Sequence, residues 1–153
     1  MLVKEASLLR RAGAWLYDGL VVCAVLMLAA GVAMAIIGGC LAIGVLTIDG
    51  YLDASDYLNQ HPIARIVYPL YLLVVMALFY AFFWCRGGQT LGMRAWRLHV
   101  INQQGLRITW TQALIRMATS AFGLGNLIAL IDPNNRSFQD HMAQTHVIYN
   151  ANK

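Results

Sequence analysis

The chain has 153 residues, of which 59% are hydrophobic and only 12% are charged, and its net charge is +4. Soluble domains usually contain about a quarter of charged residues, and a small soluble domain exposes too much of its area to hide so much apolar surface. The composition therefore excludes an ordinary soluble protein and predicts a single integral membrane domain over residues 1–153.

The first long apolar run starts immediately after an acidic residue, Asp18. From Gly19 to Ile48 the sequence contains no Asp, Glu, Lys, Arg or His. About 20 apolar residues in a row cross the hydrocarbon core of a bilayer as a helix, so we predict a transmembrane helix over about residues 14–38. A cleaved signal peptide is the weaker interpretation, because the apolar core of a signal peptide is only about 7–15 residues long.

A second apolar run predicts another transmembrane helix over about residues 65–85. Near its two ends it carries aromatic residues, which favour the membrane–water interface: Tyr68, Tyr71, Tyr80 and Trp84. The chain is therefore predicted to be a mainly α-helical, multi-pass membrane protein.

A third apolar segment, about residues 110–131, is not a simple span. It carries Arg116 and is interrupted by FGLGN, in which Gly123 and Gly125 break helices. Either it forms a third span that takes Arg116 into the membrane, or it is a re-entrant pair of short helices. Membranes accept a re-entrant segment only where protein or a watery cavity covers its backbone. The sequence leaves both alternatives open.

Basic residues set the predicted orientation. Lys4, Arg10 and Arg11 precede the first span and four arginines follow the second, whereas the loop between the spans carries three Asp and, of Lys and Arg, only Arg65. By the positive-inside tendency the N-terminus is cytoplasmic. The basic residues are then expected to contact anionic lipid headgroups of the bilayer, and nucleic acid is not an expected partner.

The segment of about residues 96–110 alternates as strands do. Apolar residues fall at every second position on both sides of a three-residue turn that contains Gly105, and this predicts a small cytoplasmic β-hairpin. Residues 145–149 are a further β-prone stretch. If that stretch pairs with the hairpin, the C-terminus is also cytoplasmic, which favours the re-entrant alternative for residues 110–131.

The sequence offers no chemistry-bearing motif of an enzyme or a metal protein. The four His are scattered, with no HExxH and no carboxylate at ligand spacing, so we expect no metal site. No Ser-His-Asp or Cys-His arrangement is present, and we expect no catalysis. The stretch GGQTLG lacks the Lys-Ser/Thr pair of a phosphate loop, so no nucleotide or other cofactor is expected.

Several motifs together resemble the RDD family of bacterial membrane proteins. They are Arg10-Arg11 followed by Ala14 and Asp18, the block GQTLGMRAWRLHVI after the second span, ALIR at residues 113–116, and the closing FQDHMAQTHVI. The resemblance covers almost the whole chain and implies a place in the bacterial cytoplasmic (inner) membrane. By motif position it implies that the Arg and two Asp of the family name correspond to Arg11, Asp18 and Asp140.

The closing motif departs from the usual form of that family at two positions. The usual form is His-Asp, then a short stretch that ends in Ala-Gly-Thr or Ser-Gly-Thr. Here Gln139 stands in place of the His, and Gln144 stands in place of the Gly before Thr145. A role that rests on the His, or a backbone conformation that needs the Gly, is therefore not carried over.

The candidate site consists of four charged residues: Arg11, Asp18, Arg116 and Asp140. Arg11 and Asp18 are on one helix face but about 10.5 Å apart along the axis. Arg116, which would enter the membrane at a similar depth, is therefore the better predicted partner of Asp18. The pair is either a structural clamp that fixes helix packing or an ion site in which Asp18 exchanges its partner for Na⁺ or H⁺.

Asp140 has a structural interpretation of its own. Ser137 and Asp140 have the spacing of a capping box with Asp in place of Glu. We expect Asp140 either to cap a helix in this way or to form a salt bridge with the basic segment around Arg94 and Arg97.

Two functions follow as hypotheses. The resemblance implies a membrane protein of the RDD type, some members of which have been suggested to exchange sodium for protons, so we expect cation transport through the Asp/Arg arrangement. Two or three helices enclose too little volume for a pathway, so a homo-oligomer is expected. The alternative is a non-transporting interaction or assembly subunit that docks a membrane partner protein through its basic cytoplasmic face.

Overall fold

The computed structural model of the chain describes residues 4–132 and 135–149. It is mainly helical and contains one small antiparallel sheet. Two compact units are formed: Met1–Val21 together with Ala77–Lys153, here called the terminal unit, and Val22–Met76, here called the central unit. The candidate site residues all belong to the terminal unit.

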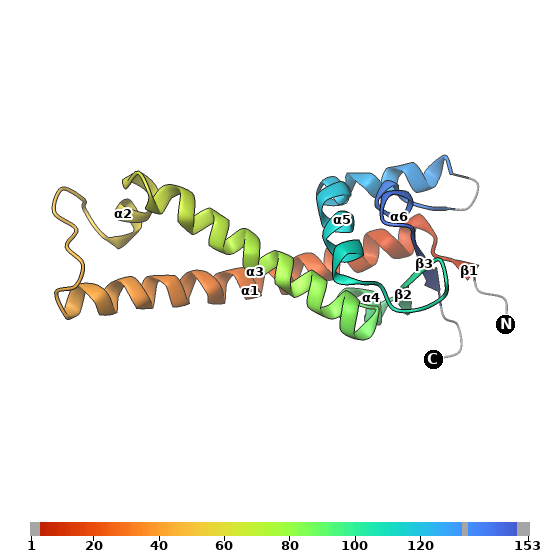
Figure 1. Cartoon of the computed structure of the whole chain (residues 1–153), viewed down its shortest axis with the longest axis horizontal. Helices are drawn as coiled ribbons and strands as arrows, with labels where there is room; N and C mark the ends of the chain where they lie inside the picture. The colour runs from red at the N-terminus through yellow and green to blue at the C-terminus, as the bar shows by residue number, and fades with distance from the viewer. Residues whose placement is uncertain (1–3, 133–134, 150–153) are drawn as a thin grey trace. The chain divides into compact units, whose positions relative to one another are not determined.

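Two helices are long and apolar enough to cross a membrane: α1 (Leu8–Ala42) and α3 (Ala64–Gly87) (Figure 1). They contain the predicted spans, residues 14–38 and 65–85, and extend beyond both. In their most apolar windows only 11% and 6% of the residues are buried, whereas the core helix of a soluble protein is mostly buried. The 35 residues of α1 are about 52 Å long at 1.5 Å each, so α1 is longer than the roughly 30 Å core of a bilayer.

The central unit holds the later part of α1, the first part of α3, and a short helix between them, α2 (Ala54–Gln60). Asp53 caps α2, because its carboxylate accepts hydrogen bonds from the backbone N–H groups of Ser55 and Asp56, at 2.9 and 2.8 Å. The Tyr71 hydroxyl donates a hydrogen bond to the carbonyl of Ala29 at 3.2 Å. This bond links α3 to α1 within the unit.

The sheet of the terminal unit consists of β1 (Lys4–Glu5), β2 (Leu98–Asn102) and β3 (Thr145–Tyr149) in the order β1-β3-β2, with both pairs antiparallel. The first and last described residues, Lys4 and Tyr149, are Cα partners in it, and Figure 1 shows β1 beside β3. The sheet therefore joins the two ends of the described chain.

The predicted hairpin over residues 96–110 is wrong in its second arm. Its first arm is β2, but residues 106–109 form no strand: the Asn102 side chain accepts hydrogen bonds from the backbone of Gln104 and Leu106, and the chain then enters a helix at Trp110. The place beside β2 is taken by β3. Both strands bury alternate residues, with Leu98 and Val100 facing the same core as Val147.

The third apolar segment is not one helix of spanning length. It divides into α5 (Trp110–Ser120) and a 3₁₀ helix, η1 (Ala121–Leu130), and a short helix, α6 (Phe138–Met142), packs against both. Because β2 and β3 pair, the chain between them begins and ends on the same side of any membrane. A single crossing by residues 110–131 does not fit that pairing, and neither α5 nor η1 qualifies as a membrane span.

Gly92 lets a short helix, α4 (Leu91–Ala95), lie directly on α1. A Cβ atom at this position would overlap the Ala14 carbonyl oxygen and would lie 2.9 Å from both the Cγ and the backbone nitrogen of Asp18. Because real Cβ contacts are longer than this, only glycine fits without a shift of the backbone. The block GQTLGM thus brings its own backbone against the candidate site residue Asp18.

Gln144 occupies the left-handed backbone conformation, with φ of 52°. It follows Ala143, the C-cap of α6, at the position where glycine most often ends a helix. Glycine is the usual residue at this position of the closing motif that the sequence resembles, and Gln144 adopts a left-handed conformation of the kind that glycine favours. Its cost is backbone strain.

We predict that Gln144→Gly stabilises the protein. Removing the left-handed strain gains about 1–2 kcal/mol, and the extra flexibility of glycine in the unfolded chain costs about 0.5–1 kcal/mol, so a net gain of roughly 0.5–1 kcal/mol is expected. Thermal unfolding in detergent micelles measures it. The matched control is Gln104→Gly, an exposed turn residue without positive φ, which should lose stability or stay unchanged. Equal behaviour of the two variants would contradict the strain at Gln144.

Candidate functional site

The candidate site is built around the carboxylate of Asp140, which is 1% exposed. Arg11 Nη1 lies 2.6 Å from its Oδ2 atom, and Arg116 Nη1 lies 2.5 Å from its Oδ1 atom. The Ser137 backbone N–H also donates to Oδ2, at 3.0 Å, so the capping box predicted for Ser137 and Asp140 is formed. The salt bridge expected with Arg94 and Arg97 is not formed, because Arg11 and Arg116 occupy both carboxylate oxygens.

Arg11, which comes from the first turn of α1, is held by contacts on three of its nitrogens. Nε donates to the Ala6 carbonyl at 3.2 Å, Nη1 also donates to the Ser137 hydroxyl at 3.3 Å, and Nη2 donates to the Asn135 carbonyl at 3.1 Å. The side chain is 3% exposed. Arg11 therefore fastens the start of α1 and the segment before it to the residues that lead into α6.

Arg116, from α5, contacts the carboxylate oxygen of Asp140 that Arg11 does not contact. Its Nη1 atom also donates to the hydroxyl of Thr145, the first residue of β3, and its guanidinium carbon lies 5.2 Å from the centroid of the Trp84 ring. A cation above an aromatic ring is attracted to the ring's negative face. The guanidinium thus contacts α6, β3 and α3, and its Nε atom has no hydrogen-bond partner in the described part of the chain.

The two guanidinium groups keep Asp140 ionised. Burial raises the pKa of the Asp140 carboxyl, but the charges of Arg116 and Arg11 outweigh burial and, with the hydrogen bonds from Ser137, hold the pKa well below its usual range. A buried carboxylate between two guanidiniums carries a net charge of about +1. Glu5, with Oε2 at 4.0 Å from Arg11 Nη2, offsets part of that charge at the edge of the site.

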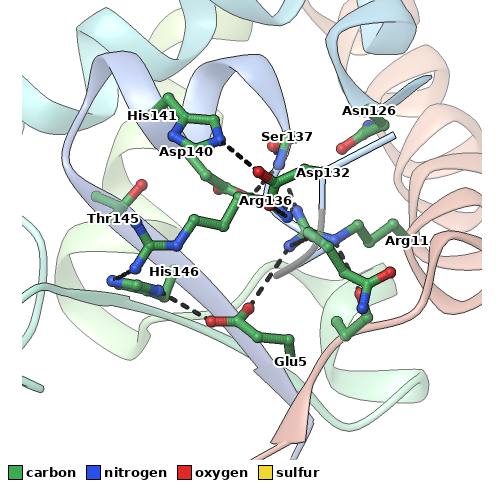
Figure 2. Close-up of polar contacts among 12 residues, drawn as sticks. Glu5, Arg11, Asn126, Asp132, Arg136, Ser137, Asp140, His141, Thr145 and His146 are labelled. Carbon is green, nitrogen blue, oxygen red and sulfur yellow. Dashed lines mark hydrogen bonds and ion pairs between the residues drawn. The ribbon is translucent and has the colours of Figure 1, made fainter. Parts of the chain in front are cut away.

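A second chain of polar contacts runs from Glu5 along the sheet (Figure 2). His146 Nδ1 lies 2.9 Å from Glu5 Oε1, and its Nε2 lies 2.7 Å from Arg136 Nη2. Because a guanidinium only donates hydrogen bonds, Nε2 must accept and the proton of a neutral imidazole is on Nδ1, where it points to Glu5. The two networks therefore share Glu5, which contacts both His146 and Arg11.

Asp18 lies outside both networks. It is 4% exposed, and its two oxygens accept hydrogen bonds from the Thr90 hydroxyl at 2.5 Å and the Gly92 backbone N–H at 2.8 Å. The predicted pair with Arg116 is not formed, since Arg116 is engaged by Asp140. No ion pair reaches Asp18 from any residue that the structure describes. Of the four predicted site residues, Arg11, Arg116 and Asp140 are thus in contact, and Asp18 is separate.

Sequence reasoning missed Thr90, Gly92 and Thr145 as site residues. Thr90 is the N-cap of α4, where its hydroxyl oxygen accepts from the Met93 backbone N–H at 3.2 Å while its proton goes to Asp18. A Thr before the helix-forming stretch LGMRA is a recognisable capping signal, which the interpretation of this region as a simple turn overlooked. Thr145 gave no such signal, because its contact with Arg116 depends on the place of β3 in the sheet.

The substituted position Gln139 has a structural role. Its Nε2 atom donates to Asn126 Oδ1 at 3.0 Å, which ties α6 to η1. The Gly125 backbone lies against the Gln139 amide oxygen, so a side chain at Gly125 would displace it. Within the described residues, no group of three His, Cys, Asp or Glu side chains is arranged to hold a metal ion. The Arg11–Asp140–Arg116 cluster therefore holds fixed charges, and Asp18 is positioned separately by Thr90 and Gly92.

We predict that Asp140→Asn lowers the free energy of unfolding by about 3–5 kcal/mol, because it leaves two buried guanidiniums without their counter-charge. Thermal or denaturant unfolding in micelles measures this. The matched control is His141→Gln on the same helix, whose side chain is 43% exposed and contacts Asp132 at 3.4 Å; it should change stability by no more than about 0.5 kcal/mol. If the two variants lose the same amount, Asp140 does not hold the unit together.

The stability loss caused by Asp140→Asn should depend on pH in a defined way. A lowered pKa in the folded state means that Asp140 stabilises the fold fully above the ordinary Asp pKa of about 3.9, and that this stabilisation is lost as the pH falls toward the lower folded value. The stability difference between the unaltered chain and Asp140→Asn should therefore stay constant from about pH 5 to pH 8. It should shrink below about pH 4. A difference that changes between pH 5 and pH 7 would contradict this assignment.

One of three comparisons with known proteins gives a match. No curated protein and no solved structure matches the chain significantly. The sequence model of the RDD family matches residues 5–144, a range that includes Arg11, Asp18, Arg116 and Asp140. Since the match covers most of the 153 residues, and since α1 and α3 are apolar enough to cross a membrane, this chain is a membrane protein that belongs to the RDD family.

Proposed function

We propose that this RDD protein binds a proton or a small monovalent cation at Asp18 and carries it across the membrane. The observation that carries the proposal is the environment of Asp18. A buried carboxylate receives two hydrogen bonds from neutral donors, Thr90 and Gly92, and no ion pair from any described residue. An acidic group held in this way in a membrane helix is a functional candidate.

The hydrogen bonds of Asp18 orient the carboxylate without neutralising it. Each carboxylate oxygen accepts one bond and keeps lone-pair capacity for another ligand. An isolated charge is costly to bury, and a proton or a monovalent cation would remove that cost. The short helix α4 therefore supports the ligand position through the Thr90 hydroxyl and the Gly92 N–H.

In the proposed carrier, the Arg11–Asp140–Arg116 cluster stays in place while Asp18 binds and releases the cation. Both arginines are buried and make ion pairs with the same carboxylate. Their further hydrogen bonds to Ser137 and Thr145 make exchange of partners costly. An arginine that cannot leave Asp140 cannot neutralise Asp18, so Asp18 stays available for a cation.

The setting that we propose is the bacterial cytoplasmic membrane, with the N-terminus on the cytoplasmic side and no enzymatic activity. The basic residues before α1 and after α3 support this orientation by the positive-inside tendency. Two membrane helices enclose no pathway of their own, so the carrier would be a homo-oligomer in which copies of the chain complete the path.

We predict that liposomes containing the purified protein show cation-dependent proton flux and that Asp18→Asn abolishes it. A pH-sensitive dye inside the liposomes, read while sodium or potassium gradients are imposed, measures the flux. Thr90→Val removes one donor and keeps the carboxylate, so it should shift the cation concentration at half-maximal rate without abolishing transport. The matched control is Asp49→Asn, which removes an exposed Asp outside the site and should leave flux unchanged.

Folding of each variant is checked by its unfolding temperature and its size in detergent. An unaltered protein that gives no flux above empty liposomes, although it is folded, would refute transport. Equal flux from Asp18→Asn and the unaltered protein would refute the role of Asp18.

The second candidate is an assembly subunit that docks a membrane partner protein. The specific observation is that Arg94 and Arg97 are both exposed and take part in no ion pair within the described chain. Exposed charges of one sign guide association with a partner of opposite charge. This function needs no pathway and no oligomer.

We predict for this candidate that a mild-detergent pull-down recovers a stoichiometric membrane protein and that Arg97→Gln with Arg94→Gln reduces its recovery at least tenfold. The matched control is Arg107→Gln, an exposed arginine outside this pair. Recovery of the chain alone, in membranes where it is expressed at its natural level, would contradict the candidate. Because Asp18 is buried, Asp18→Asn should leave partner recovery intact, which separates this function from transport.

A further inference from the structure

A pocket of about 250 Å³ lies where the chain leaves its second apolar helix. Its walls come from the last turns of α3 and from α4, and all its lining residues belong to the terminal unit. The volume is below the range of about 300–1,000 Å³ that encloses drug-sized ligands. The pocket is therefore large enough for a compact polar headgroup, and the rest of such a ligand would lie outside it.

Two arginines line this pocket and carry no counter-charge. Arg86 and Arg94 are exposed, and no carboxylate of the described chain pairs with either. The Arg86 guanidinium carbon lies 5.6 Å from the centroid of the Phe82 ring, and its N–H groups donate to no residue of the described chain. Two guanidiniums beside one cavity offer forked donors that match a phosphate group.

The hydrogen-bond donors of the other polar side chains in the lining are already engaged. The Gln89 amide donates to the Leu98 carbonyl at 2.9 Å and contacts His99, and the Thr90 hydroxyl donates to Asp18. The side-chain donors of the lining that remain open to a ligand are therefore the two guanidiniums. This selects an anion over a sugar or another neutral polar ligand.

The remaining walls are apolar and face outward. Phe82 is 45% exposed, Leu91 is 44% exposed and Phe83 is partly exposed. A free phosphate would leave these apolar side chains exposed to solvent. An acidic protein surface would place charged groups against them. A ligand with an anionic head and an apolar tail satisfies both parts, and the end of a membrane helix is where such a ligand is abundant.

We propose that this pocket binds an anionic phospholipid, with its phosphate between Arg86 and Arg94 and its acyl chains along Phe82, Phe83 and Leu91. The lipid site does not depend on cation transport, because neither the two arginines that bind the phosphate nor its apolar walls belong to the Asp18 site. It shares one wall residue, Thr90, with the Asp18 site. A bound lipid therefore borders the hydrogen bond that orients Asp18.

We test this with the full-length protein in detergent by native mass spectrometry. The probes are phosphatidylglycerol and phosphatidylcholine with the same acyl chains. The unaltered protein should retain phosphatidylglycerol with at least tenfold higher affinity. The double variant Arg86→Gln with Arg94→Gln should lose about tenfold or more of that affinity, because both charge-assisted phosphate contacts are removed.

The matched control is Arg97→Gln with Arg107→Gln, which removes the same charge from exposed positions of the same unit that do not line the pocket. It should bind phosphatidylglycerol as the unaltered protein does. Equal loss in both double variants would overturn the pocket, since it would show only general attraction between opposite charges. The unfolding temperature of each variant confirms that it is folded.

Two further measurements distinguish a lipid phosphate from a soluble phosphate compound and from a protein partner. Inorganic phosphate and glycerol 3-phosphate, added at the concentration that saturates the lipid site, should not displace phosphatidylglycerol. Displacement by either would show a soluble anion site and overturn the lipid assignment. A co-purified protein that remains on the unaltered chain, leaves the Arg86/Arg94 variant and excludes phosphatidylglycerol would overturn it in favour of a protein partner.

Discussion

One buried carboxylate between two buried guanidiniums organises the terminal unit. Asp140 lies 129 residues from Arg11 and 24 residues from Arg116 in the sequence, and its two oxygens bring α1, α5 and α6 to one point. The desolvation of three charges is offset only while all of them are in place. The cluster therefore makes the positions of these helices depend on one another. Both arginines of the cluster are engaged by Asp140, and Asp18 receives hydrogen bonds only from the neutral donors of Thr90 and Gly92 within the described chain.

Local patterns in the sequence were enough to predict the parts of the fold that depend on local physics. The predicted spans lie inside α1 and α3, since the length of an apolar run is itself the physical cause of a membrane helix. The capping box of Ser137 and Asp140 is equally local, because its two residues are three apart. Arg11 and Asp140 were named through the family resemblance and not from local physics; the structure brings them into contact with Arg116, whereas the predicted pair of Asp18 and Arg116 is absent.

Pairing across long sequence distances was not predictable in the same way. The alternation around Gly105 fits a hairpin, but β3 supplies a better-matched buried face to β2, and nothing local shows that a strand 40 or so residues on will be preferred. Arg116 was predicted to pair with Asp18 only because both residues were expected at a similar depth in the membrane. In the structure, the turn at Gln144 and the path of β3 bring Asp140 and Thr145 to Arg116 instead. These choices depend on tertiary packing.

The joining of β1 to β3 has a consequence for the order in which the protein can be made. Ala6 donates its backbone N–H to the Val147 carbonyl at 2.9 Å, so the strand that precedes α1 finds its partner only when nearly all of the described chain has been synthesised. At the ribosome's rate of about 5–20 residues per second, α1 can enter the bilayer seconds before Arg11 meets Asp140. During that interval Arg11 needs water or lipid phosphate as a temporary partner. Nascent chains stopped before β3 are therefore incomplete at both ends, and quality-control proteases would find two unfolded termini at once.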